Sequence, residues 1–389
     1  RPGMAGVSMR PWCRSGSLAL LEASAFLLGW AATAEAACAA PFSASTTLTP
    51  SHSHQVTSLA WVPGTENSGT DLLIAGSREQ VLRIWSYSSS AWTHTNTLSG
   101  IHGAVYALTW SSTYDLLASG SGDGSIRLWP LSVLTTSQVC HVEALGNGNA
   151  LCCDGDGLGC EGKYVASWRD AGMTMARRVH ALAWIEGSST LASSWGDGVV
   201  RLWTYDSLGT RLLSFSTELA ATGRAYSLTW LDSLSLLAVG SPDWSRPELW
   251  QLSGTSANTV LSDSEVCPTS HCGGVPATAT DTSNSKLATG GDDSTVKIWD
   301  PSTGNHLYTL TGHATGVTSL TWLDSEARVV SGGSDGSINL WDPTSNAAAV
   351  ETMATAHTDE VTALLWMSSL ELLASASNDL SVKIWQCSR

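Results

Sequence analysis

Residues 312–342 read GHATGVTSLTWLDSEARVVSGGSDGSINLWD. Side chains alternate between two faces along residues 317–322, and two more short runs, 328–332 and 337–341, follow after turns. Alternation over short runs bounded by Gly, Asp and Ser is typical of half-buried strands rather than helices. The stretch therefore predicts three β-strands joined by tight turns, which could not bury their faces alone.

The chain repeats this unit along its length. A tryptophan closes each unit, at Trp85, Trp129, Trp203, Trp250, Trp299, Trp341 and Trp385. The successive gaps are 44, 74, 47, 49, 42 and 44 residues, so all but one match a four-stranded propeller blade, and the long gap holds about 30 inserted residues. A second tryptophan ends the first strand of most units, at Trp61, Trp110, Trp184, Trp230, Trp322 and Trp366.

These units resemble the WD40 repeat family, which implies an all-β fold: a single seven-bladed β-propeller of four-stranded antiparallel blades. The resemblance covers roughly residues 42 to 386, although Trp-Asp occurs only at Trp299-Asp300 and Trp341-Asp342. Sequence repeats of this family run out of phase with the blades, and the last unit ends at Trp385. We therefore expect residues 42–49 to supply the fourth strand of the last blade and to close the ring.

The resemblance also implies a hydrogen-bonded tetrad of a loop His, a second-strand Ser or Thr, a turn Asp and the closing Trp. A buried indole N–H and a buried carboxylate both need partners. The complete sets are His102, Ser119, Asp123, Trp129; His271, Thr289, Asp293, Trp299; His313, Ser331, Asp335, Trp341; and His357, Ser375, Asp379, Trp385.

Three units depart from this tetrad. Unit three keeps Ser193, Asp197 and Trp203 but has no His, and unit four has Val239 in the Ser position. Unit one has Ala75 and Glu79 where Ser and Asp are expected. We therefore expect blades 1, 3 and 4 to be less rigidly tied, and Glu79 to matter less for stability than Asp335.

Residues 1–36 precede the repeats and predict a secretory signal peptide. Arg10 and Arg14 lead into an apolar run, and Ala34-Glu35-Ala36 offers small residues for cleavage after Ala36. The run is short for a membrane span. The expected mature chain is thus a propeller over residues 37–389, in the secretory pathway or outside the cell. Because most WD40 proteins are intracellular, a cytoplasmic or organellar location is the alternative.

The inserted residues, about 135–162, are expected to form a cysteine-rich loop. Residues 163–168, KYVASW, are the expected outer strand of that unit; the alternative places SQVCHVEAL there and moves the loop to the other face. The loop lacks the Cys-x-x-Cys pairs of structural zinc sites, so no metal is expected.

No phosphate loop ending in Gly-Lys-Ser/Thr and no His-Glu-x-x-His zinc-protease motif is present in the sequence, and the Gly-x-Ser-x-Gly pattern at residues 332–336 falls in the turn between two predicted strands. The net charge of −15 disfavours nucleic-acid binding. We therefore expect a non-catalytic scaffold without a cofactor, which binds a protein or peptide partner, as the resemblance implies. The alternative is a secreted ligand- or glycan-binding propeller, or a propeller hydrolase with a central-pocket site.

The expected partner surface lies on the face of the His loops and Asp turns, over blades 3 and 4. It gathers Arg177, Arg178, His180, Trp195, Arg224, Tyr226 and Trp244. Trp, Tyr and Arg are enriched at binding hot spots, and a basic patch on an acidic protein favours an acidic partner. The alternative is that both tryptophans lie flat over neighbouring turns and the arginines are solvated.

Cys38 and Cys387 are predicted to form a disulfide if the protein is secreted, because eight cysteines follow the leader and these two flank the junction of the closing strand. A bridge across nearly the whole chain could contribute about 3–5 kcal/mol to stability. The alternative is two free thiols on frayed chain ends. Non-reducing peptide mapping of secreted protein should find the two joined. Recovery of both as alkylated free thiols would reject the bond.

Overall fold

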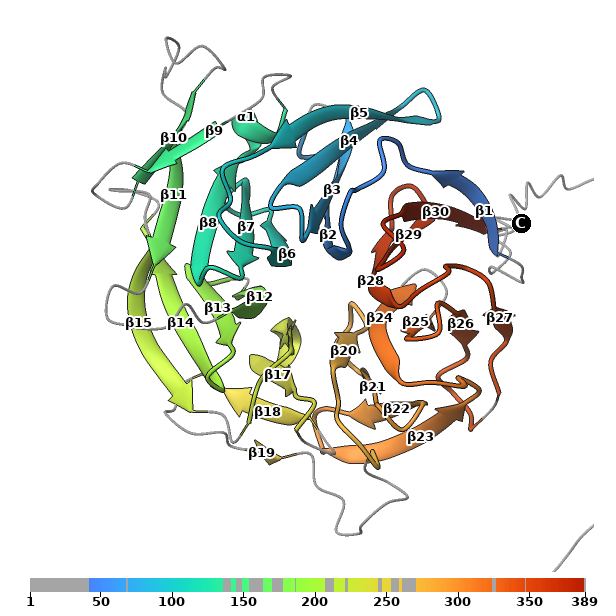
Figure 1. Cartoon of the computed structure of the whole chain (residues 1–389). Coiled ribbons are helices and arrows are strands. Elements are labelled where there is room, and N and C mark those ends of the chain that lie inside the picture. The colour runs from blue at the N-terminus through green and yellow to red at the C-terminus, as the bar shows by residue number, and fades with distance from the viewer. Residues whose placement is uncertain are drawn as a thin grey trace, which may run out of the picture. The chain divides into compact units, whose positions relative to one another are not determined.

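Seven antiparallel sheets stand around a common axis in the computed structural model (Figure 1). The structure describes residues 42–67, 69–135, 141–144, 149–153, 164–169, 178–185, 187–206, 213–220, 223–243, 247–252, 259–260, 271–323, 327–346 and 348–387. The expected leader, residues 1–36, and Cys38 lie outside these ranges, so both remain predictions. Within the described ranges, no helix combines the length and apolar character that crossing a bilayer requires.

Five blades each take four consecutive strands, which pair antiparallel in sequence order. Blade 1 has β2 (Val56–Val62), β3 (Asp71–Ser77), β4 (Leu82–Ser88) and β5 (Ala91–Leu98), and blade 3 has β12 (Val179–Ile185), β13 (Thr190–Trp195), β14 (Val199–Tyr205) and β15 (Leu213–Ala220). Blade 4 has β16 (Ser227–Leu231), the 3-10 turn η1 (Asp232–Leu234), β17 (Leu236–Gly240), β18 (Glu248–Gln251) and β19 (Thr259–Val260). Blade 5 has β20 (Ala277–Thr280), β21 (Leu287–Gly290), β22 (Thr295–Asp300) and β23 (Asn305–Thr311), and blade 6 has β24 (Val317–Leu323), β25 (Arg328–Gly333), β26 (Ile338–Trp341) and β27 (Glu351–Met353).

Blade 7 is built from both ends of the chain. It combines β28 (Val361–Met367), β29 (Leu372–Ser377) and β30 (Val382–Cys387) with β1 (Phe42–Thr47) as its fourth strand. β1 runs antiparallel to β30, with Phe42 opposite Cys387. The backbone N–H of Phe42 also donates to both carboxylate oxygens of Glu351 in blade 6, at 3.1 Å each. The expected closure by the N-terminal strand is therefore confirmed.

Blade 2 has six strands. It contains β6 (Val105–Ser111), β7 (Leu116–Ser121), β8 (Ser125–Pro130) and the helical turn α1 (Leu131–Leu134), followed by β9 (His141–Ala144), β10 (Asn149–Cys153) and β11 (Tyr164–Arg169). β11 pairs with β8, as expected for residues 163–168. The insertion is not simply a loop, however, because β9 and β10 form a hairpin that pairs along the outside of β11. The hairpin gives the backbone groups at the edge of β11 hydrogen-bond partners.

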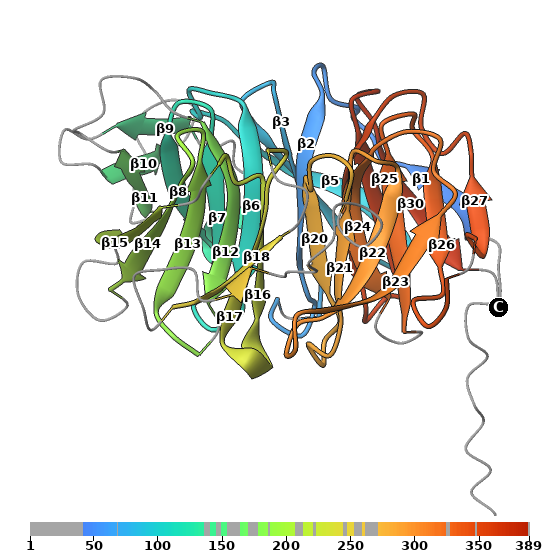
Figure 2. The ribbon, with the colours of Figure 1, turned by 90° about the horizontal axis from the view of Figure 1, so that it is seen from below.

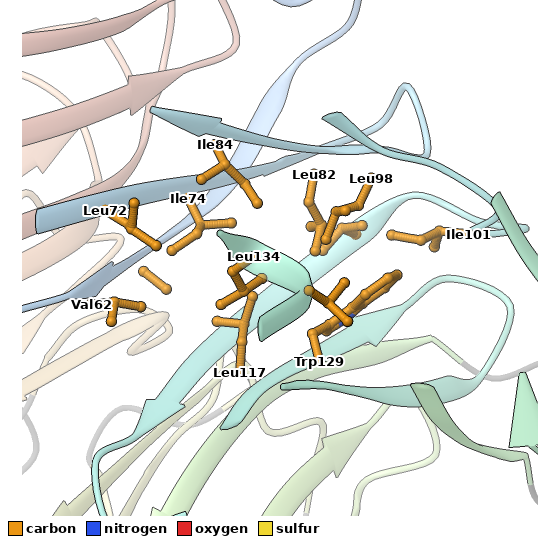
Figure 3. Close-up of a cluster of buried hydrophobic side chains, with 13 residues drawn as sticks. Val62, Leu72, Ile74, Leu82, Ile84, Leu98, Ile101, Leu117, Trp129 and Leu134 are labelled. Atoms are coloured by element: carbon orange, nitrogen blue, oxygen red, sulfur yellow. The ribbon is translucent and has the colours of Figure 1, made fainter. Parts of the chain in front are cut away.

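The core lies between neighbouring blades rather than inside any one of them. Figure 3 shows one such cluster, in which Leu72 and Ile84 of blade 1 pack near Leu117 and Trp129 of blade 2. All seven closing tryptophans are buried, none more than 5% exposed. Truncating a buried Trp to Ala typically costs about 3–5 kcal/mol, so these side chains are a major source of blade cohesion.

Seen from the side, the strands run between two faces of the ring (Figure 2). The upper face is defined as the face that carries the turns between the second and third strands of each blade. It also carries the connections that lead into the first strand, called the inner strand because it lies nearest the axis. The lower face carries the remaining turns.

Deleting residues 42–49 should expose the edge of β30 and cause aggregation or a lower melting temperature, because that edge then lacks its partner. Size-exclusion chromatography and thermal unfolding measure both effects. A variant that lacks only residues 1–41 keeps β1 and serves as the control. The closure would be dispensable if deletion of residues 42–49 left solubility and melting temperature unchanged.

Candidate functional site

The hydrogen-bonded tetrad is complete in blades 5 and 7. In blade 5, the indole of Trp299 donates to the Thr289 hydroxyl at 2.8 Å, and Nε2 of His271 lies 2.8 Å from that hydroxyl. Nδ1 of His271 lies 2.8 Å from Asp293. A neutral imidazole that carries its proton on Nδ1 donates to the carboxylate and accepts from the hydroxyl. Blade 7 repeats this geometry with His357, Asp379, Ser375 and Trp385.

Blade 6 contains a longer version of the network. Trp341 and His313 both reach the Ser331 hydroxyl, at 2.7 and 2.6 Å. Asp335 reaches His313 through Ser337, whose hydroxyl donates to the carboxylate at 2.6 Å and lies 3.2 Å from Nδ1 of His313. Burial lowers the pKa of His313 to about 4, against the charge of Asp335, so this imidazole is neutral near pH 7.

Blade 2 lacks the histidine of the predicted network. His102 is exposed, so its assignment to the tetrad is wrong, while Trp129 still donates to Ser119 at 2.8 Å. Asp123 instead accepts from Ser125 and from the buried guanidinium of Arg127, at 2.6 and 3.2 Å. The arginine supplies a charged donor to the carboxylate, which therefore does not need the imidazole.

Blade 1 has more hydrogen bonds around its turn acid, Glu79, than its sequence indicates. Glu79 accepts from Nδ1 of His52 and from Nε of Arg83, at 2.8 Å each. The backbone N–H and the hydroxyl of Ser53 donate to its other oxygen at 2.8 and 2.6 Å. These bonds outweigh the effect of burial and lower the pKa of Glu79 to about 2. Because Ala75 has no hydroxyl, the second ring nitrogen of His52 lacks the partner that the tetrad provides in other blades. Among the described residues, Nε2 of His52 is buried without a hydrogen bond.

Blade 3 replaces its missing histidine with Trp195. This side chain is only 1% exposed, and its indole donates to Ser193 at 2.8 Å, the same hydroxyl to which Trp203 donates at 2.7 Å. The guanidinium of Arg201 lies 5.0 Å from the Trp195 ring and pairs with Asp197 at 2.9 Å. The prediction that Trp195 belongs to an exposed partner surface is therefore wrong, because the ring occupies the space of the absent imidazole.

A buried or half-buried cation recurs two residues before the closing tryptophan, and sequence reasoning missed it. The position holds Arg83, Arg127, Arg201, Lys297 and Lys383 in blades 1, 2, 3, 5 and 7. In the first three blades the arginine pairs with the turn acid four residues earlier. The signal was visible as a basic residue two positions before five of the seven closing tryptophans.

The inner strands of five blades carry a β-bulge at their second residue. The pairing register shifts around Thr57, Tyr106, His180, Thr318 and Thr362. A bulge re-aims the side chain of the extra residue. Each of the three threonines donates to a backbone carbonyl of the next blade, Thr57 to Val105, Thr318 to Val361 and Thr362 to Val56. Tyr106 and His180 therefore interrupt a series of hydrogen bonds between blades.

These two rings belong to an aromatic–arginine cluster, defined as Tyr106, Arg178, His180, Arg224 and Tyr226. The His180 and Tyr226 rings stack with centroids 4.2 Å apart, and the Arg178 guanidinium lies 4.3 Å from the Tyr106 centroid. Arg224 lies 5.8 Å from the Tyr226 centroid. Figure 1 shows β6 and β12, which carry Tyr106 and His180, side by side near the centre of the ring.

The charges of the cluster are unequal. Arg224 makes two side-chain bonds to Asp243, at 2.9 and 3.1 Å, so its position is fixed and its charge is compensated. Arg178 is exposed, and Arg78 lies 6.0 Å from the Tyr106 centroid. Burial, followed by the charges of Arg178 and Arg224, lowers the pKa of His180 to about 4. The cluster thus combines a neutral aromatic surface with guanidinium groups that can receive an anion.

Four of the seven predicted partner residues come together in this cluster: Arg178, His180, Arg224 and Tyr226. Arg177 and Trp244 lie outside the described residues, as does the side chain of Cys387, so the Cys38–Cys387 bond stays a prediction. Tyr106 was missed, although it follows Val105 as His180 follows Val179.

Comparison with known proteins gives one family and one fold. The family model described as WD domain, G-beta repeat matches residues 43–86, 92–130, 265–300, 304–342 and 350–386. The chain is also similar to the crystal structure of the WD40 beta propeller domain of Doa1, with a TM-score of 0.65 and 19% identity over 90% of this chain and 98% of that one. At this identity the structural match shows the fold alone.

Glu79→Ala should now destabilise the protein more than Asp335→Ala, contrary to the expectation from sequence. Removing Glu79 leaves donors of the buried His52 and the half-buried Arg83 without an acceptor and should cost about 2–4 kcal/mol. Asp335→Ala should cost about 1–3 kcal/mol, because Ser337 remains beside His313. Denaturant unfolding compares the two, with Glu79→Gln as the isosteric control; a smaller loss for Glu79→Ala would contradict this view of blade 1.

Proposed function

Because the chain belongs to the WD40 repeat family, we propose that it is a non-catalytic scaffold that binds an acidic segment of a protein partner on its upper face. The aromatic–arginine cluster is the observation that supports this proposal. Its members come from three neighbouring blades and meet at the ends of the inner strands, where a single partner segment can contact all of them.

Charge favours an acidic partner. The protein carries a net charge of −15, so its overall field repels acidic molecules, and attraction has to arise locally. Arg178 offers an exposed guanidinium that rests on Tyr106. A guanidinium held against an aromatic ring keeps its planar donors available for a carboxylate and loses less side-chain freedom on binding.

The cluster replaces structural contacts that other blades keep. Thr57, Thr318 and Thr362 use the bulge position to bond to the next blade. Blades 2 and 3 place half-buried rings there instead: His180 stacks on Tyr226, and Tyr106 lies under the guanidinium of Arg178. Loss of a stabilising contact at an aromatic cluster is typical of a surface shaped by binding. We also propose a place for this scaffold in the secretory pathway, and the signal peptide predicted at residues 1–36 supports this proposal.

Arg178→Glu should weaken binding of a glutamate-rich synthetic peptide at least about tenfold, as expected for a hot-spot arginine. Fluorescence anisotropy measures the affinity, with lysine-rich and serine-rich peptides as specificity controls. Lys286→Glu makes the same charge reversal in the turn between β20 and β21 on the lower face and should bind like the parent. The proposed site is wrong if both variants stay folded and bind the acidic peptide equally well.

A further inference from the structure

Six blades share one backbone contact at the upper face. The residue three positions after the tetrad position of the second strand donates its N–H to a backbone carbonyl that lies one to three residues before the inner strand. The pairs are Arg78 to Gln55, Gly122 to Ala104, Gly196 to Arg178, Asp292 to Gly274, Ser334 to Gly316 and Asn378 to Glu360, at 2.7–3.0 Å. The donor positions are therefore structurally equivalent, and their side chains can be compared directly.

Only blades 2 and 3 have glycine at this position, and these are the blades with a ring at the bulge. Arg78, Asp292, Ser334 and Asn378 show that the shared backbone geometry accepts a side chain. Neither Gly122 nor Gly196 has the positive φ that would require glycine. The reason for glycine therefore lies in the space beside the rings.

The two glycines differ in what a side chain would meet. A Cβ at Gly122 would lie 3.1 Å from Cε2 of Tyr106, which is tight, so packing against the ring explains that glycine. A Cβ at Gly196 would lie 3.5 Å from Nε2 of His180, an ordinary contact. Packing therefore does not require Gly196, which is exposed and places no side chain over Nε2 of the half-buried His180.

That edge is available for a ligand. Among the described residues, the His180 ring stacks on Tyr226 and takes part in no hydrogen bond. Arg178, whose carbonyl accepts the N–H of Gly196, carries the exposed guanidinium beside it. A carboxylate placed here can accept from both the imidazole N–H and the guanidinium.

We propose that Gly196 keeps the Nε2 edge of His180 open and thereby decides which side chain of the partner the cluster admits. This inference rests on the proposed function and makes it specific: an acidic side chain enters over Gly196 and meets His180 and Arg178 together. A larger residue at position 196 would occupy the entry without disturbing the fold.

The experiment compares Gly196→Asn, which copies the residue found in blade 7, with Gly196→Ala. Ser334→Asn places the same side chain over Thr318 in blade 6 and is the matched control. Two readouts are taken on the full chain: affinity for the glutamate-rich peptide, and the rate at which diethyl pyrocarbonate modifies His180, followed by peptide mass mapping. Thermal unfolding verifies that each variant is folded.

Gly196→Asn should weaken peptide binding about tenfold and slow the modification of His180, whereas Gly196→Ala and Ser334→Asn should change neither by more than about twofold. Parental affinity in a folded Gly196→Asn protein would overturn the inference. If the parent protein binds no acidic peptide, the proposed function fails. The role of Gly196 is then tested by the modification rate of His180 alone, and equal rates in the parent and Gly196→Asn would show that Gly196 does not keep the edge open.

Discussion

Every blade must provide an acceptor for the indole N–H of a buried closing tryptophan, and the variation among blades follows from this constraint. Five blades use a hydroxyl from the second strand: Ser119, Ser193, Thr289, Ser331 and Ser375. Where that hydroxyl is missing, another group takes its place. Trp85 donates to the carbonyl of Thr49, and Trp250 donates to Glu248. The indole bond is thus kept while the residue that accepts it changes.

The blades divide into those that tie the ring together and those that present a surface. At the bulge position, blades 1, 6 and 7 use a threonine hydroxyl to reach the next blade. Blades 2 and 3 have Tyr106 and His180 there, and these rings interact with each other, with arginines and with Tyr226, which precedes β16 of blade 4. The ion pairs of Arg127 and Arg201 hold the upper turns of blades 2 and 3 in place, so the surface blades remain ordered without complete tetrads.

Periodicity was sufficient to predict the fold, because tryptophan spacing and strand alternation are properties of each unit. The closing role of residues 42–49 followed from counting strands. Trp195 and His102 were misjudged for a different reason: whether a ring is buried depends on which neighbour fills the space, and a single unit does not contain that information. The hairpin of β9 and β10 was missed because its strands are short and pair only with an inserted neighbour. Arg178, His180, Arg224 and Tyr226 could be grouped because equivalent positions of neighbouring blades meet.

The shared last blade also affects how the protein is made. Of the strands of the propeller, β1 leaves the ribosome first and its partner β30 leaves last. During synthesis the early blades can assemble locally, whereas β1 stays unpaired until the rest of the propeller has been translated. Pairing of such distant segments slows folding, and an unpaired strand edge invites intermolecular association in the meantime. Because β1 closes the finished ring, it leaves an unpaired strand during synthesis. The nascent chain therefore depends on protection against intermolecular association until β30 emerges.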